Sequence, residues 1–238
     1  MKRPQIFLFH FAGGNCYSFQ FLTPLLSGFE VIIPELPGRG RRMHEPLLNE
    51  FDDAAVDLYN QVISRLSDDT PFLLYGHSMG ASFVLRLANM LEAAGRYPAG
   101  VVVSGNAGPG IEKPGRRVRY LLNKPEFLEE LKKLGGLPQE LIDNEELFGF
   151  FEPVLRADFE ITERNNLAME PAIQAPLYAV MGSLESDVDK IDNWSGFVQH
   201  TFHTEVLEGD HFFIRQHPRR MADIISTFYR RMQTMPQQ

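Results

Sequence analysis

The segment Gly76-His77-Ser78-Met79-Gly80 contains a serine whose surroundings could make it a nucleophile. It fits the pattern Gly-x-Ser-x-Gly, in which the serine lies on a strained turn between a strand and a helix and its hydroxyl is exposed. Glycines flank the serine because side chains there would collide with the neighbouring strand and helix. An apolar run ends at Tyr75 and a helical pattern begins at Met79. We therefore predict that Ser78 is a nucleophile, with an ordinary glycine-rich turn as the alternative.

A serine nucleophile needs a base, and His211 is the candidate because it lies between the last predicted strand and the last predicted helix. With an acid between the two residues, the chain order serine, acid, histidine is that of the α/β-hydrolases. We interpret the remaining histidines as surface or hydrogen-bonded structural residues: His10, His44, His77, His200, His203 and His217.

Short apolar runs predict the strands that must position these residues. An unbroken run that is stopped by a turn is typical of a parallel strand covered on both faces. The runs are Gln5–Phe9, Val31–Ile33, Phe72–Tyr75, Val101–Val103, Leu177–Met181 and the more mixed Thr204–Leu207. Apolar residues at spacings of three and four predict helices over Phe51–Leu66, Met79–Ala94 and Pro218–Met232. This alternation predicts an α/β fold with a mostly parallel sheet and helices on both faces.

The segment between Gly108 and Pro176 breaks the alternation of strands and helices. It has no convincing strand, and amphipathic stretches such as Phe127–Leu134 and Glu145–Leu155 predict helices instead. A segment of this length is too long for a bare loop. We therefore expect a single domain over residues 1–238, with a helical lid inserted at approximately residues 109–170.

The composition excludes several classes of function. The chain has 238 residues and a formal net charge of −8, which argues against binding to nucleic acid or to an anionic membrane. No stretch approaches the ~18 apolar residues of a membrane span. The single cysteine, Cys16, cannot form an internal disulfide, and the chain lacks the clustered Cys and His residues of a structural metal site. We expect a cytoplasmic protein without a bound metal.

Motifs distributed over almost the whole chain resemble those of the type II thioesterases that accompany nonribosomal peptide and polyketide synthases. They are Phe9-His10-Phe11-Ala12-Gly13-Gly14, Glu35-Leu36-Pro37-Gly38-Arg39, Gly76-His77-Ser78-Met79-Gly80-Ala81, Leu134-Gly135-Gly136-Leu137-Pro138, Leu155-Arg156-Ala157-Asp158-Phe159 and Gly209-Asp210-His211-Phe212-Phe213. Many hydrolases share the serine motif. The segments Glu35–Arg39 and Leu155–Phe159 are far more specific to this family. The resemblance implies an α/β-hydrolase with a helical lid that removes stalled or wrong acyl groups from the phosphopantetheine arms of carrier proteins.

The resemblance also implies roles for individual residues. Ser78 would be the nucleophile and His211 the base, and the N–H groups of Met79 and Ala12 would form the oxyanion hole. Phe11, next to Ala12, is assigned to substrate binding. The mechanism needs no metal or cofactor. The implied partner is an acyl or peptidyl carrier protein that bears phosphopantetheine, and we expect a monomer.

The catalytic acid is a position at which the chain departs from the family pattern. Family members carry an aspartate three residues after the glycine that ends the penultimate strand, followed three residues later by valine. Gly182, Glu185 and Val188 keep that register, with glutamate in place of aspartate. Asp187 could reach the imidazole from a differently bent loop and is the second candidate. The remaining candidates are Asp189 and Asp210.

A basic stretch in the predicted lid could dock an acidic carrier protein. It contains no acid and comprises Lys113, Arg116, Arg117, Arg119 and Lys124. The docking hypothesis assigns Arg116 and Arg117 to substrate binding, and a solvated charged face is the alternative.

Four phenylalanines of the lid could line an acyl pocket or form the lid's own core: Phe148, Phe150, Phe151 and Phe159. We favour the core, because aromatic residues at helical spacing usually pack against neighbouring helices.

The function that we predict is that of an editing thioesterase acting on carrier-bound acyl groups. A general acyl esterase or acyl-CoA thioesterase would share every catalytic residue and differ only in its lid and docking surface. A hydrolase-fold binding protein without turnover is the other alternative. It is favoured only by the missing aspartate at the usual acid position.

Overall fold

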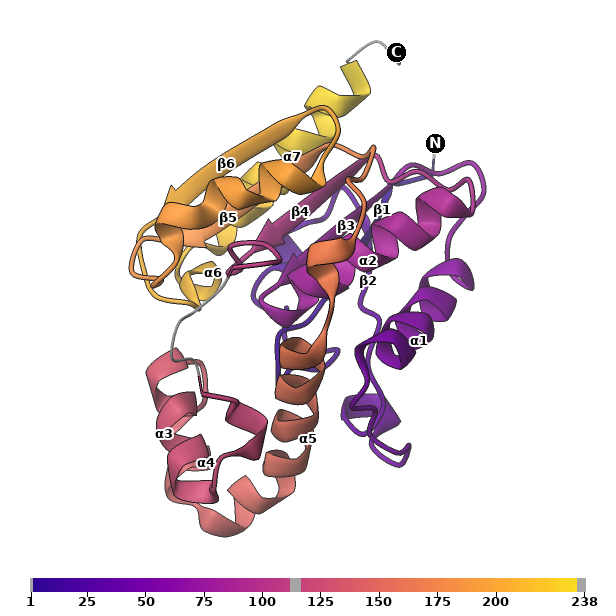
Figure 1. The fold of residues 1–238 in the computed structure, drawn as a ribbon. Helices are drawn as coiled ribbons and strands as arrows, with labels where there is room; N and C mark the ends of the chain where they lie inside the picture. The colour runs from indigo at the N-terminus through magenta and orange to yellow at the C-terminus, as the bar shows by residue number, and fades with distance from the viewer. Residues whose placement is uncertain (1, 112–116, 235–238) are drawn as a thin grey trace.

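Six parallel strands form one sheet in the order β2-β1-β3-β4-β5-β6 (Figure 1). The computed structural model describes residues 2–111 and 117–234. The strands are β1 (Gln5–Phe9), β2 (Glu30–Ile32), β3 (Phe72–His77), β4 (Gly100–Ser104), β5 (Leu177–Gly182) and β6 (Phe202–Leu207). Parallel strands end at the same edge of a sheet, so the loops that follow β1, β3, β5 and β6 lie close together.

Helices cover both faces of the sheet and one of its ends. They are α1 (Phe51–Ile63), α2 (Met79–Ala93), α3 (Lys124–Leu134), α4 (Gln139–Asp143), α5 (Glu145–Arg164), α6 (Phe213–Gln216) and α7 (Pro218–Thr234). Short 3₁₀ helices cover Thr23–Leu25, Gly40–Arg42, Arg119–Leu121, Leu167–Met169 and Val188–Phe197. Within the described residues, no helix has both the length and the apolar character needed to cross a membrane.

Alternate residues of each strand belong to two separate cores. Phe7 and Phe9 of β1 are buried with α1 and α2, whereas Ile6 and Leu8 are buried with α7 and with the segment 19–29. Both faces of a strand are therefore apolar, which is why the strands appear in the sequence as unbroken apolar runs. The predicted α/β fold, with a mostly parallel sheet and helices on both faces, is confirmed.

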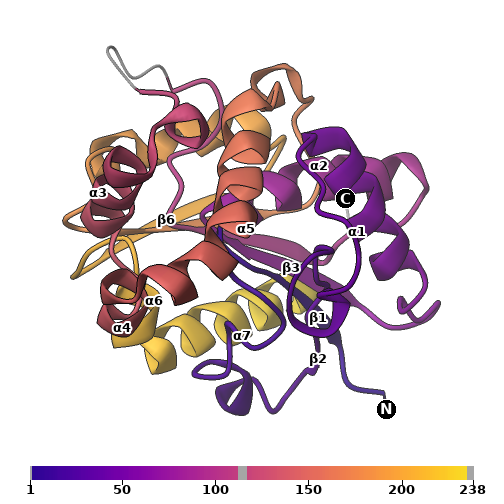
Figure 2. The ribbon, with the colours of Figure 1, turned by 90° about the horizontal axis from the view of Figure 1, so that it is seen from below.

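Helices α3, α4 and α5 lie between β4 and β5 in the chain, in the segment where the sequence predicts helices and no strand. Figure 1 shows them below the sheet, and Figure 2, which views the molecule from that side, shows them in front of it. We call residues 117–169 the lid. The lid has its own apolar core, formed by Phe127, Leu131, Leu141, Phe148, Leu155 and Phe159.

The four lid phenylalanines differ in their surroundings. Phe148 and Phe159 belong to the lid core, as favoured from the sequence. The core prediction is wrong for Phe150, which is 73% exposed. Phe151 is partly exposed and faces the chamber described below, which Phe159 also lines. Helical spacing defines the faces of α5 but does not reveal which face meets α3 and α4.

Candidate active site

Ser78 occupies a strained turn between β3 and α2. Its backbone angles are φ 57° and ψ −113°, and within residues 2–111 and 117–234 it is the single non-glycine residue with positive φ. Such a conformation costs on the order of 1–3 kcal/mol and persists only where the surrounding structure enforces it. A Cβ at Gly76 would lie 2.2 Å from the Gly80 carbonyl oxygen, and a Cβ at Gly80 would lie 2.1 Å from that of Phe9. Both glycines are therefore required for the turn.

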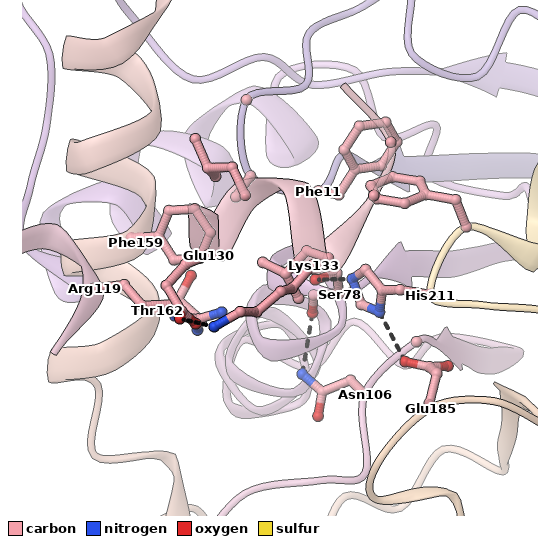
Figure 3. Close-up of a pocket in the computed structure, with 18 of the residues that line it drawn as sticks. Phe11, Ser78, Asn106, Arg119, Glu130, Lys133, Phe159, Thr162, Glu185 and His211 are labelled. Atoms are coloured by element: carbon pink, nitrogen blue, oxygen red, sulfur yellow. Dashed lines mark hydrogen bonds and ion pairs between the residues drawn. The ribbon is translucent and has the colours of Figure 1, made fainter. Parts of the chain in front are cut away.

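A chain of hydrogen bonds connects Ser78, His211 and Glu185 (Figure 3). The Ser78 hydroxyl donates to Nε2 of His211 at 2.9 Å, and Nδ1–H of His211 donates to Oε2 of Glu185 at 2.7 Å. These donors follow from the tautomer that an ionised Glu185 imposes on the ring. The structure thus brings together the predicted nucleophile, the predicted base and the first of the predicted acids.

The other candidate acids face elsewhere. Asp187 accepts a hydrogen bond from the Ser186 hydroxyl at 3.2 Å and pairs with Lys190 at 3.3 Å. Asp189 is exposed, and exposed Asp210 accepts from the Phe212 backbone N–H at 2.8 Å. Since Ser78 and Glu185 occupy both ring nitrogens of His211, the structure does not bring these three aspartates to the ring.

His77 lies beside the site but is buried and held neutral. Its ring centroid is 5.1 Å from that of His211, and its Nδ1 is 2.9 Å from the Ser104 hydroxyl. Burial, followed by the nearby charge of His211, holds the pKa of His77 well below its usual value. His77 therefore adds no positive charge next to the imidazole that would have to accept the serine proton. Its structural interpretation from the sequence fits these surroundings.

The loop after β1 adjoins the serine turn. β1 and β3 are paired with Phe9 opposite Gly76, so residues 10–14 leave the sheet next to Ser78. Among the described residues, neither the Ala12 N–H nor the Met79 N–H donates to a protein acceptor. Both donors are therefore available for an anion beside the serine.

Asn106 is a residue of the site that the sequence interpretation missed. Its side-chain amide donates to the Ser78 carbonyl at 3.1 Å and to the Ser82 hydroxyl at 3.3 Å. Its own backbone carbonyl accepts from the Trp194 ring N–H at 2.7 Å. Asn106 therefore helps to hold the strained serine turn. The usable signal in the sequence was its place two residues after β4, the strand that follows the nucleophile in the chain.

A chamber of about 1100 Å³ lies between the serine and the lid. Ser78, His211, Glu185 and Ala12 line the chamber, and so does Phe11, the residue that the sequence assigns to substrate binding. The lid contributes apolar and charged side chains, several of which are labelled in Figure 3: Arg119, Glu130, Leu131, Lys133, Leu134, Leu155, Phe159 and Thr162. The chamber can therefore enclose an acyl group next to Ser78.

The described residues of the basic stretch are each paired with an acid that lies outside the stretch. Arg117 pairs with Glu126 on the lid surface and does not line the chamber. Arg119 pairs with Glu163 at 2.6 Å and faces the chamber. Lys124 pairs with Glu145 at 3.3 Å. Lys113 and Arg116 lie outside the described residues.

The lid also touches the loop that carries the histidine. A Cβ at Gly136, between α3 and α4, would lie 2.1 Å from the Phe212 ring. Arg215 donates to the Gly136 carbonyl at 3.1 Å, and its guanidinium lies 4.6 Å from the centroid of the Phe212 ring. Backbone of the lid therefore packs directly on the neighbour of His211.

Comparisons with known proteins give consistent matches over nearly the full chain. Residues 4–229 match the family model of the thioesterase domain. Linear gramicidin dehydrogenase LgrE of Brevibacillus parabrevis is 32% identical over 93% of this chain and 86% of the relative. The probable anguibactin biosynthesis thioesterase AngT of Vibrio anguillarum is 29% identical over 90% of this chain and 87% of the relative. The solved structure of YbtT, a type II thioesterase of the yersiniabactin NRPS/PKS pathway, has a TM-score of 0.88 at 30% identity, covering 97% of this chain and 94% of YbtT.

The name of LgrE gives a different activity, whereas the family model, AngT and YbtT agree on a thioesterase. The resemblance to the type II thioesterases is confirmed. The chain belongs to the thioesterase family, and its relatives include type II thioesterases of nonribosomal peptide and polyketide biosynthesis.

Proposed function

We propose that this protein is an editing type II thioesterase, which hydrolyses acyl groups from the phosphopantetheine thioesters of carrier proteins. The relatives from the anguibactin and yersiniabactin pathways support this substrate class. The observation that carries the chemistry is the hydrogen-bonded series Glu185, His211, Ser78 at the wall of a chamber. Ser78 is the nucleophile, His211 the general base and Glu185 the acid of a serine triad.

The reaction begins with proton transfer from Ser78 to His211. Nε2 of His211 takes the hydroxyl proton while Oγ attacks the thioester carbonyl carbon. Glu185 keeps the ring in the Nδ1–H tautomer and stabilises the imidazolium that develops. The C–S bond then breaks, and the phosphopantetheine sulfur receives the proton from Nε2. An acyl-Ser78 ester remains.

A water molecule completes the cycle in the same site. His211 removes a proton from the water while the water oxygen attacks the carbonyl carbon of the acyl ester. The bond to Ser78 then breaks, Ser78 regains a proton from Nε2, and the free acid leaves. In both halves the negative charge on the former carbonyl oxygen is stabilised by the N–H groups of Ala12 and Met79. Loss of one such donor costs on the order of 10²–10³ in rate in a well-studied serine hydrolase.

A general acyl-CoA thioesterase would use the same residues, so the comparison of carrier with coenzyme A substrates decides between them. The geometry argues against a binding protein without turnover. Glu185 accepts a hydrogen bond from His211, as a triad acid does, and its other oxygen is held by the Gly182 N–H.

Labelling with a fluorophosphonate tests for an activated serine. The wild-type protein should be modified at Ser78, located by peptide mass spectrometry, and Ser78→Ala should not be modified. Correctly folded wild-type protein that resists the probe would favour the binding protein. Labelling at another serine would refute the proposed nucleophile.

A further inference from the structure

A carboxylate of the lid reaches the loop that carries the oxyanion donor. Asp158 lies in α5 and is fully buried. Its Oδ2 accepts a hydrogen bond from the Gly13 backbone N–H at 2.7 Å. The same carboxylate forms a two-pronged pair with Arg39, at 2.5 Å from Nη1 and 2.8 Å from Nη2. Three donors from two distant loops therefore converge on one side chain of the lid.

Helix α5 holds Gly13 by a second contact as well. A Cβ at Gly13 would lie 2.6 Å from Cδ2 of Leu155, which is three residues before Asp158 and so on the same face of the helix. Gly13 also has φ +75°, a conformation that side chains rarely adopt. The Ala12–Gly13 peptide is therefore fixed by hydrogen bonding from one side and by close packing on α5.

We propose that Asp158 is a positioning residue that orients the oxyanion loop, and that Arg39 in turn orients Asp158. The inference rests on the role proposed above for the Ala12 N–H. The Ala12 N–H belongs to the preceding Phe11–Ala12 peptide, which is joined to the anchored Ala12–Gly13 peptide only through φ and ψ of Ala12. Fixing the Ala12–Gly13 peptide therefore limits the directions in which the Ala12 N–H can point. The lid then does more than enclose the acyl group. The contacts of α5 with Gly13 determine whether the oxyanion hole is formed.

If the Arg39–Asp158 pair served only the stability of the fold, loss of the hydrogen bond from the Gly13 N–H would not affect catalysis. Buried ion pairs can often be replaced by apolar side chains of similar volume without loss of stability. Such a replacement removes the acceptor of the Gly13 N–H as well, and apolar groups cannot supply another. The two roles can therefore be separated by comparing single and paired substitutions at Arg39 and Asp158.

The experiment measures kcat and KM on an acyl-pantetheine thioester, which needs no carrier docking, together with the affinity for an acyl trifluoromethyl ketone. The ketone forms a tetrahedral adduct with the serine, so its affinity reports on the oxyanion hole. In Asp158→Leu and in the double variant Arg39→Met/Asp158→Leu, neither of which offers an acceptor to the Gly13 N–H, kcat and ketone affinity should fall by about 10- to 100-fold. KM should stay within about threefold, since the lost interaction acts in the transition state.

Asp158→Leu leaves the buried Arg39 without its partner and should lose thermal stability, which the double variant should regain while its kcat stays low. Arg156→Gln is the matched control on α5: Arg156 donates to the Tyr120 and Leu122 carbonyls within the lid and does not contact Gly13. It should keep wild-type kcat and ketone affinity. A stable double variant with wild-type kcat would show that the Arg39–Asp158 pair is structural only and would overturn the proposal.

Amide hydrogen exchange separates this inference from the proposed function. Exchange over residues 10–14 should accelerate in both Asp158 variants and not in Arg156→Gln, whatever the substrate of the enzyme. Unchanged exchange would refute the positioning role. A wild-type protein that hydrolyses no thioester would instead refute the proposed function, while the exchange result would still report on the loop.

Discussion

At the scale of single residues, the surroundings of Glu185 explain how a glutamate can serve at the position where the sequence resemblance predicts an aspartate. One oxygen, Oε1, accepts a hydrogen bond from the Gly182 N–H at 2.8 Å, while the other accepts from His211. The Glu185 backbone N–H donates back to the Gly182 carbonyl at 3.1 Å. The tight turn folds the longer side chain against its own backbone, which accommodates the additional methylene.

We expect Glu185→Gln to lower kcat at least ~10²-fold with little change in KM. Glutamine can still accept from Gly182, but its NH₂ group would face Nδ1 of His211 and favour the tautomer with the proton on Nε2. That tautomer cannot accept the proton of Ser78. Steady-state kinetics on an acyl-pantetheine thioester provide the measurement.

Asp187→Asn is the matched control, because it changes the same kind of group two residues away, where the carboxylate pairs with Lys190. Its loss of kcat should be far smaller. The reverse order of the two effects would make Asp187 the triad acid, and two mild effects would exclude both residues.

At the scale of elements, the lid contacts two of the loops to which we assign catalytic groups, those after β1 and β6. Helix α5 contacts the loop after β1 through Asp158, and the turn between α3 and α4 contacts Phe212 through Gly136. The position of the lid is therefore linked to the positions of the proposed oxyanion donor Ala12 and of His211.

Gly136→Ala tests the second of these contacts. The added methyl would collide with the Phe212 ring, and φ at Gly136 is +83°, so the turn or the ring must move. We expect kcat to fall by about tenfold, since small displacements of catalytic groups have large effects on rate. The measurement is kcat on a small thioester.

Gly149→Ala is the control, because it adds a methyl to the same lid at a position with no neighbouring atom within 4 Å. It should leave kcat unchanged and stabilise α5 by roughly 0.5–1 kcal/mol. Equal activity of the two variants would show that the contact between the lid and Phe212 does not affect catalysis.

The sequence predicted the type of most elements because each has a local signature. The strands are apolar throughout because their alternate residues are buried in two different cores. The close-packed glycines Gly76 and Gly80 mark the turn that follows one of these strands. The register from Gly182 also identified Glu185 as the first candidate acid. The contacts of Asp158 were not predictable in this way, because its partners Arg39 and Gly13 are 119 and 145 positions away. Only an acid within an apolar helical segment hinted at a buried partner.

At the scale of the whole molecule, two buried histidines should make the fold sensitive to acid. Burial, strengthened by the charge of Arg39, lowers the pKa of His10 from 6.5 to about 4, and the pKa of His77 is also well below its usual value. The unfolded chain binds a proton at each site below about pH 6.5, while the folded chain does not. Stability should therefore fall with pH between about 6.5 and 4, by on the order of 1.4 kcal/mol per pH unit and histidine.

His10→Asn tests this dependence through stability and not activity, because His10 lies in the loop of residues 10–14 beside the serine. The Nδ1 of His10 lies 3.0 Å from the Phe11 carbonyl, and an asparagine amide can keep that hydrogen bond. Urea unfolding at a series of pH values from 4.5 to 8 should give a slope below pH 6.5 that is smaller by about 1.4 kcal/mol per pH unit than in the wild type. An unchanged slope would show that His10 does not contribute to acid sensitivity.

The most direct test of the central claim is the fate of an acyl group on a phosphopantetheinylated carrier protein, followed by intact-protein mass spectrometry. Wild-type enzyme should return the carrier to its free thiol form with a higher kcat/KM than for the matching acyl-CoA. Ser78→Ala, with unchanged circular dichroism, should leave the acyl carrier intact. Deacylation by Ser78→Ala at more than a few per cent of the wild-type rate would contradict the serine mechanism, and a wild-type preference for acyl-CoA would contradict the assignment to carrier proteins.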